Sequence, residues 1–294
     1  MTVVDVKRIL VVGGGIAGLS AAACLHRRGF AAELVERKPS WPDEAVADLH
    51  ESDHGVRVVF DDGSSADYDL VVAADGIRST VRTRIFPAAK PAYADTMAWR
   101  SLAPVRPDGV RSLMILMGDG CFFGLVPVGD GQTYGFAGMR SEEFDDPMSG
   151  RLSRFRRRFA GFGGPVPEYL DGLRRDEQVH CGPVEWLELG RWHTGRVVLI
   201  GDAAHAAPPH MGEGGSMALE DAVVLAEILG NADTLETALE AFERRRRPQG
   251  RVGPAAEPSR RRSLGSATAK RDAALRARGD EMLRERYRFL TAVP

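Results

Sequence analysis

Residues 8–36 read RILVVGGGIAGLSAAACLHRRGFAAELVE, in which two short apolar runs flank a glycine-rich helical segment. The run 8–12 is short and rich in β-branched residues, which is typical of a buried strand, and 31–35 is typical of a second one. Between them, 19–28 has the composition of a helix, which Gly29 is expected to end. The stretch therefore predicts a strand–helix–strand unit.

The turn after the first strand carries glycine at the spacing G-x-G-x-x-G, and Glu36 follows the second strand. Glycine serves a tight turn, the approach of backbone to a pyrophosphate, and close helix–strand packing. An acid at the position of Glu36 bonds the hydroxyls of an adenosine ribose. The pattern predicts a dinucleotide site for FAD or NAD rather than NADP, with Gly13, Gly15 and Gly18 at the phosphates.

A second informative stretch, residues 196–221, reads RVVLIGDAAHAAPPHMGEGGSMALED. An apolar strand ends at Gly201-Asp202, a loop rich in proline and glycine follows, and a helix begins at about Gly215. Helix N-termini offer unpaired N–H groups and a positive dipole. A carboxylate beside them, that of Asp202, accepts hydrogen bonds from hydroxyls, so the stretch favours a nucleotide cofactor with a polyol chain.

A third strand leads into an arginine-rich turn in residues 69–82, DLVVAADGIRSTVR, where Asp75-Gly76 follows the apolar run. These three stretches occur in an order that resembles the single-component (class A) FAD-dependent aromatic monooxygenases, similar to para-hydroxybenzoate and salicylate hydroxylases. The resemblance extends from Ile9 to about Arg247.

The resemblance implies an enzyme that uses FAD, NAD(P)H and O2 to hydroxylate a small aromatic or similarly electron-rich substrate. It places the ADP half of FAD on the first stretch, the ribityl chain on Asp202, and the flavin ring on the loop after Pro209. The usual loop reads Gly-Gln-Gly, and here Glu213 replaces the glutamine. The implied cofactor-binding residues are Gly13, Gly15, Gly18, Glu36, Arg37, Asp75, Gly76, Arg78, Gly201, Asp202, Pro209, Gly212, Glu213 and Gly214.

The fold class expected is α/β, with a Rossmann-like FAD-binding sheet, an antiparallel β substrate domain and C-terminal helices. Residues 1–90 and 181–250 are expected to form the FAD-binding domain. Residues 91–180, where apolar segments alternate with Gly-Asp-Gly turns, are expected to form the substrate domain. A linker and helix are expected over 251–294.

Charge and composition exclude several function classes. The net charge of -2 is near balance, and the arginine runs 244–247 and 260–262 are better explained as solvated helix faces with a polar linker than as nucleic-acid sites. A basic amphipathic helix is expected over 151–162. No apolar run is long enough to cross a bilayer, and no signal-peptide pattern opens the chain. The three scattered cysteines show no metal or disulfide spacing, so we expect reduced thiols, no metal and a cytoplasmic protein.

Two histidines compete for a role in the chemistry. His210, just past Pro209, is the candidate catalytic base, because deprotonating a phenol makes its ring more nucleophilic. A polar loop residue is the alternative interpretation of His210, and His205 is expected to hold the loop. Arg100 and Tyr134 fall on the expected substrate sheet. Both are candidates for lining a substrate pocket; the alternative is that Arg100 is an ordinary surface residue and Tyr134 an ordinary core residue.

The chain departs from the family pattern after Pro39. A parallel strand needs a crossover of roughly a dozen or more residues, yet residues 44–49 already resemble the start of the β-rich part. We therefore expect an internal shortening that removes a helix, an edge strand and a pyrophosphate arginine, for which Arg37 or Arg78 would partly substitute. Alternatives to the monooxygenase are another flavin oxidoreductase on this scaffold, or a shortened non-catalytic FAD-binding-like protein. An exposed edge also favours a homodimer.

Overall fold

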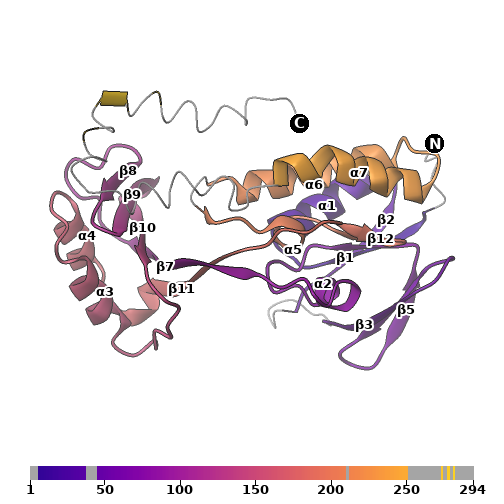
Figure 1. Cartoon of the computed structure of the whole chain (residues 1–294), viewed down its shortest axis with the longest axis horizontal. Helices are drawn as coiled ribbons and strands as arrows, with labels where there is room; N and C mark the ends of the chain where they lie inside the picture. Colours follow the sequence, from indigo (N-terminus) through magenta and orange to yellow (C-terminus); the bar gives the residue numbers. More distant parts are fainter. Residues whose placement is uncertain are drawn as a thin grey trace. The chain divides into compact units, whose positions relative to one another are not determined.

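The computed structural model describes residues 6–37, 45–209 and 212–250, together with the isolated positions Ala273, Ala277, Arg278 and Glu281. In those ranges the chain forms two compact units (Figure 1). The first comprises the residues up to Ala92 together with those from Glu185 to the end of the last long helix. The second comprises Tyr93–Val184.

The first unit is organised around a five-stranded sheet in the order β12-β13-β6-β1-β2. β1 pairs in parallel with both β2 and β6, β13 pairs in parallel with β6, and β12 runs antiparallel to β13. Strands of a parallel sheet covered on both faces are apolar throughout, which explains why every residue of β6 and β13 is buried. The strands are β1 (Arg8–Val12), β2 (Ala31–Val35), β6 (Leu70–Ala73), β12 (His193–Thr194) and β13 (Val197–Leu199).

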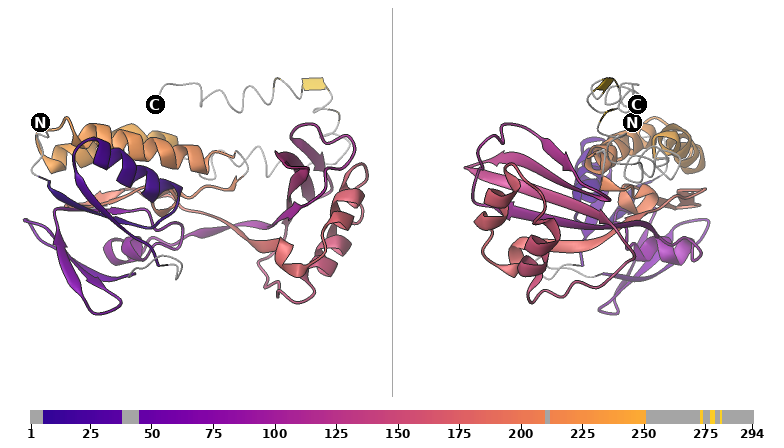
Figure 2. Two further views of the ribbon diagram at one scale, coloured as in Figure 1. Left: turned by 180° about the vertical axis from the view of Figure 1, so that it is seen from behind. Right: turned by 60° about the vertical axis from the view of Figure 1, so that its left-hand side comes forward.

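Helices lie on one side of this sheet and a smaller sheet lies on the other (Figures 1 and 2). On the helical side are α1 (Ile16–Arg27), α6 (Gly214–Leu229) and α7 (Leu235–Gly250). The other side holds α2 (Thr80–Ile85) and the antiparallel strands β3 (Val46–Glu51), β4 (Val56–Phe60) and β5 (Ser65–Tyr68), while α5 (Asp202–His205) follows β13 directly. The Rossmann-like sheet expected from the sequence is confirmed.

The chain on the two sides of Asp69 belongs to two different sheets. Asp69 separates β5 from β6, and its carboxylate accepts the backbone N–H groups of Lys7 and Arg8 at 2.7 Å each. The chain therefore leaves the small sheet at Asp69 and enters the parallel sheet beside β1. A continuous apolar pattern carries no mark of such a change of sheet.

The second unit is an antiparallel sheet in the order β11-β7-β10-β9-β8, with helices on one of its faces (Figure 2). That face holds the core, in which Trp99 and Phe123 pack against Phe155 and Phe159. The elements are β7 (Ala92–Ala103), β8 (Met114–Met117), β9 (Cys121–Gly129), β10 (Gln132–Arg140), α3 (Arg151–Phe159), α4 (Val166–Gly172), the 3-10 turn η1 (Asp176–Gln178) and β11 (Val179–Trp186).

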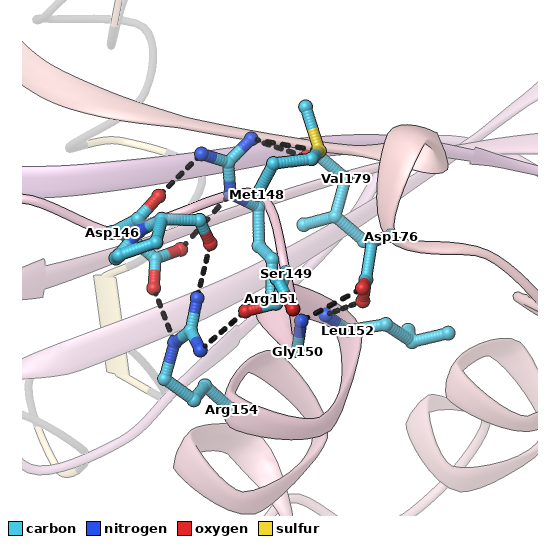
Figure 3. Close-up of polar contacts among 10 residues, drawn as sticks. Asp146, Met148, Ser149, Gly150, Arg151, Leu152, Arg154, Asp176 and Val179 are labelled. Carbon is cyan, nitrogen blue, oxygen red and sulfur yellow. Dashed lines mark hydrogen bonds and ion pairs between the residues drawn. The ribbon is translucent and has the colours of Figure 1, made fainter.

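The basic helix α3, expected over 151–162, differs from the sequence prediction in its C-terminal end. It ends at Phe159 rather than Phe162. Gly150 precedes it and offers no side-chain cap, so Asp176 accepts the N–H groups of Gly150 and Leu152 at 2.8 Å each (Figure 3). The buried Asp146 pairs with Arg151 at 3.2 Å and with Arg154 at 2.6 Å. Two arginines of this helix, Arg151 and Arg154, are thus held in ion pairs with a buried carboxylate.

No helix in the described ranges combines the length and apolar character that crossing a bilayer requires.

Candidate functional site

Two glycines of the G-x-G-x-x-G pattern, Gly13 in the turn between β1 and α1 and Gly18 inside α1, are required by packing, and Gly15 is not. A Cβ on Gly18 would lie 1.8 Å from the carbonyl oxygen of Gly13, and one on Gly13 would lie 2.5 Å from that of Ala74. Neither position accepts a side chain. At Gly15 nothing lies within 4 Å of the Cβ position, and φ is −78°, which suits any residue. The missing side chain at Gly15 therefore leaves open space instead of relieving a clash.

That open space lies at the beginning of α1. Gly15 is the residue before the helix, it is exposed, and no side chain caps the first turn. The first N–H groups of a helix have no partners within it and carry partial positive charge. Open space and unpaired donors are what a phosphate needs at a helix N-terminus.

Glu36 is tied to the same turn. Its Oε2 accepts the backbone N–H of Gly14 at 2.6 Å, so the carboxylate at the end of β2 holds the turn in place. Arg37, the next residue, is exposed and has no hydrogen bond or ion pair with the described residues. No polar contact among the described residues therefore ties Arg37 to the turn.

Asp75 follows β6 and lies against the turn, since a Cβ on Gly13 would be 2.9 Å from the Asp75 Cα. Its Oδ2 accepts the N–H groups of Thr80 and Val81 at 2.8 and 3.2 Å, which caps α2. Its Oδ1 is buried and has no hydrogen-bond partner among the described residues. Burial raises the pKa of this carboxyl, although the N–H groups it accepts from oppose that shift.

The two arginines near this motif have protein partners. Arg78, a predicted cofactor residue, is largely exposed and forms a two-point ion pair with Glu185, at 2.9 and 2.8 Å. Arg82, which the sequence did not single out, is buried and donates to the carbonyls of Ile77 at 2.6 Å and Ala203 at 3.2 Å. Burial lowers its pKa. Arg82 thus links the turn before α2 to the turn after β13.

The Gly201-Asp202 turn lies between the two helices that begin at the site. Gly201 has φ 57°, and a Cβ there would lie 2.9 Å from the Ala17 Cβ of α1 and 3.4 Å from the Ala218 Cβ of α6. The next residue, Asp202, is exposed and forms no hydrogen bond with the described part of the chain. Its Oδ1 is 3.8 Å from the Cβ position of Gly214. A carboxylate available to a ligand therefore sits at the beginning of α6.

The loop before α6 is described only in part. Pro209 is exposed, Gly212 has φ 70°, and Glu213 directly precedes the helix. Gly215, in the first turn, is close to α1, because its Cβ position is 3.5 Å from the Ile16 Cδ1. His210, the candidate base, lies outside the described residues, and so its role stays a prediction.

Four separate segments of the first unit therefore meet at one place. They supply two adjacent helix N-termini, an available carboxylate at Asp202, and a turn whose glycines leave room. Such a site can hold an anionic, polyhydroxylated ligand through backbone N–H groups and one carboxylate.

Sequence reasoning missed the side chains that support this arrangement, namely Arg82, Asp221 and Arg246. Asp221 and Arg246 are fully buried and paired at 2.7 Å. A single acid among Ala218, Ala222 and Leu225 on the buried side of α6 is the signal that was present in the sequence. Arg246 was expected to be on a solvated face and is instead in the core, a correction that follows from this pairing.

The second unit has a separate feature of its own, on the sheet face opposite its core. Tyr134 and Phe136 stack with ring centroids 5.9 Å apart, and Phe122 contacts Phe136 at 6.1 Å. Arg100 lies beside Phe136 across the strand pair, is exposed, and has no hydrogen bond or ion pair with the described residues. Trp99, by contrast, points into the core. Tyr134 and Arg100 thus share a partly exposed aromatic face.

Comparison with known proteins agrees with this geometry. Residues 184–252 match the family described as FAD binding domain, and residues 11–67 match the NAD(P)-binding Rossmann-like domain. Aurachin C monooxygenase/isomerase of Stigmatella aurantiaca is 34% identical over 200 residues, which cover 67% of this chain and 52% of that protein. The 2-heptyl-3-hydroxy-4(1H)-quinolone synthase of Pseudomonas aeruginosa is 35% identical over 189 residues, 62% of this chain and 49% of the enzyme. The chain spans about half the length of these curated relatives.

The fold is also found in solved structures. HpxO of Klebsiella pneumoniae, complexed with FAD and uric acid, superposes with a TM-score of 0.81 at 22% identity, covering 91% of each chain. A salicylate hydroxylase substrate complex gives a TM-score of 0.74 at 21% identity, covering 95% of each chain.

Proposed function

We propose that this chain, a relative of the class A FAD-dependent hydroxylases, binds FAD and hydroxylates a small aromatic or similarly electron-rich molecule with NAD(P)H and O2. The observation that carries the proposal is the meeting of the glycine turn, the two helix N-termini and the available Asp202 carboxylate in one unit. When bound, FAD supplies the redox chemistry, by accepting hydride equivalents and activating O2.

The residues at the site suit FAD. The open space at Gly15 and the N–H groups of α1 would receive the pyrophosphate, and Asp202 would accept hydrogen bonds from the ribityl hydroxyls. Glu36 would face the adenosine ribose while it holds Gly14. The loop of Pro209, Gly212, Glu213 and Gly214 would line the ring, and Asp75-Gly76 would lie at the pyrophosphate.

Within the second unit by itself, we propose that the partly exposed face of the sheet binds a planar ring. Phe136, Tyr134 and Phe122 offer stacking surfaces to a planar ring. The Arg100 guanidinium, which has no partner among the described residues, would bind an acidic group of that ring. His210 stays our proposed base for a ring hydroxyl.

A specific observation keeps the non-catalytic alternative open. β2 is the last strand of the parallel sheet, and β3, which begins at Val46, belongs to a different sheet. Residues 36–45 thus join them with no room for a crossover and a further parallel strand, as the proposed shortening requires. Another flavin oxidoreductase on the same scaffold is the third possibility.

The purified chain tests these three possibilities. We expect added FAD to bind, as a flavin-fluorescence titration measures, and NADH or NADPH oxidation to increase when an aromatic acid such as salicylate is added. FAD binding without pyridine-nucleotide oxidation favours the non-catalytic alternative, and oxidation that no aromatic compound stimulates favours another flavin oxidoreductase. No FAD binding refutes the proposal. A cytoplasmic location and a homodimer through the β2 edge are further proposals, which fractionation and light scattering would test.

A further inference from the structure

The Gly201-Asp202 turn is held from behind by a buried charged network. Asp221 of α6 accepts the N–H of Gly201 on Oδ2 at 2.9 Å. The same oxygen shares a hydrogen bond of 2.6 Å with the His205 Nε2. The other carboxylate oxygen of Asp221, Oδ1, accepts a hydrogen bond from the Arg246 Nε at 2.7 Å. One carboxylate thus joins the turn, α5, α6 and α7.

The side chains of Asp221, Arg246 and His205 are all buried. The side chains of Asp221 and Arg246 are 0% exposed and that of His205 is 3% exposed. Trp192 stacks on the His205 ring with centroids 4.7 Å apart. Arg246 also donates to Glu220 at 2.7 Å and to the Met217 carbonyl at 3.2 Å, so its orientation is fixed by several acceptors.

This arrangement costs free energy that an apolar core would not. Burial by itself raises the pKa of Asp221, but His205 and Arg246 hold it below its ordinary value, which keeps the carboxylate ionised. Buried ion pairs stabilise a fold little, and apolar residues of similar size often do as well. Stability alone therefore does not explain why a charge is placed directly behind Gly201.

We propose that Asp221 and Arg246 are positioning residues, which fix the Gly201 peptide so that the adjacent Asp202 carboxylate faces the cofactor. This inference rests on the FAD-binding function proposed above. Ala17 of α1 and Ala218 of α6 pack closely against the Cβ position of Gly201, at 2.9 and 3.4 Å. A turn of the Gly201 peptide would redirect Asp202, while the core around it stayed folded.

A double-mutant cycle separates positioning from a structural role. Asp221→Asn keeps the shape of the side chain but removes the charge that holds Arg246 and His205. If Asp221 acts through Asp202, we expect Asp221→Asn to raise the FAD dissociation constant about tenfold in the otherwise natural chain and by less than about twofold in the Asp202→Ala background. FAD affinity is measured by flavin fluorescence, and the apo form's thermal unfolding is measured in parallel.

The same two helices supply a matched control. Glu227 of α6 pairs with Arg245 of α7 at the surface, at 3.5 Å, so Glu227→Gln should leave FAD affinity unchanged. If Asp221→Asn does not fold, Arg246→Lys retains a cation with fewer donors, and about a threefold loss confined to chains that carry Asp202 is expected.

Equal losses in both backgrounds, or lower thermal stability with unchanged FAD affinity, would overturn the inference while leaving the proposed function intact. A natural chain that binds no FAD would overturn the proposed function itself, and the inference with it.

Discussion

Gly15 offers the sharpest test of the site, because the protein alone places no limit on a side chain there. In Gly15→Val the new Cβ would meet no atom within 4 Å, and φ of −78° is compatible with valine. Gly18→Ala is the opposite case, because its Cβ would come within 1.8 Å of the Gly13 carbonyl oxygen. The two substitutions therefore separate loss of a ligand from loss of the fold.

The expected magnitudes differ accordingly. Valine is a poorer residue than glycine before a helix, so Gly15→Val should cost about 1 kcal/mol of apo stability or less. Hydrogen bonds to a charged group contribute about 1.5–3 kcal/mol each. Displacing the pyrophosphate from two N–H groups at the start of α1 should therefore weaken FAD binding by about a hundredfold or more. Gly18→Ala should destabilise the apo form by several kcal/mol, since the backbone itself must shift.

Both quantities can be measured on the same preparations, FAD affinity by flavin-fluorescence titration and apo stability by urea unfolding. Gly161→Val is the matched control, because Gly161 also has open space around its Cβ position but lies in the other unit. An unchanged FAD dissociation constant in Gly15→Val, with the control equally unaffected, would refute the assignment of the pyrophosphate to this turn.

Four further outcomes are expected. Asp202→Ala should weaken FAD binding about tenfold or more, since a charge-assisted hydrogen bond to the ribityl chain is lost; equal affinity by fluorescence titration would count against it. Glu36→Ala should lower FAD affinity while the thermal stability of the apo form changes little. Lower apo stability with unchanged FAD affinity would mean that Glu36 only holds the Gly14 N–H. The pKa of Asp176 is held below its ordinary value by the N–H groups of Leu152 and Gly150, so its stabilising effect is present above the unfolded pKa and is lost as pH falls through the folded one. The difference in thermal unfolding between the natural chain and Asp176→Asn should therefore begin to shrink as the pH falls below about 4, and a constant difference down to pH 3 would contradict this. The shortening after Pro39 should produce weak FAD retention and largely uncoupled NAD(P)H oxidation, because an open site admits water; near-stoichiometric hydroxylated product would show the shortening to be harmless.

The parts of the fold that the sequence predicted are those governed by local rules. Gly13 and Gly18 are required by contacts within a few residues of the chain and with the end of β6, so their spacing was visible without a structure. The strands 8–12 and 197–199 were visible as apolar runs because almost all of their residues are buried, whereas the strand 31–35 is only partly buried. The short helix α4 and the break at Asp69 were not predicted, because a seven-residue helix and a change of sheet leave no periodic pattern.

Arg78 and Arg82 show why the remaining site residues escaped sequence reasoning. Both lie in one arginine-rich turn and look equivalent along the chain, yet Arg78 pairs with Glu185 and Arg82 binds the Ala203 carbonyl, 107 and 121 residues away. Whether a guanidinium is exposed or buried depends on which distant acceptor reaches it, and a single sequence does not contain that information. The same argument applies to Arg246 and Asp221, whose pairing joins two helices. Glycine spacing therefore locates where a ligand would bind, whereas the side chains that hold the site in shape are set by long-range pairs, and it is those pairs that mutagenesis has to find.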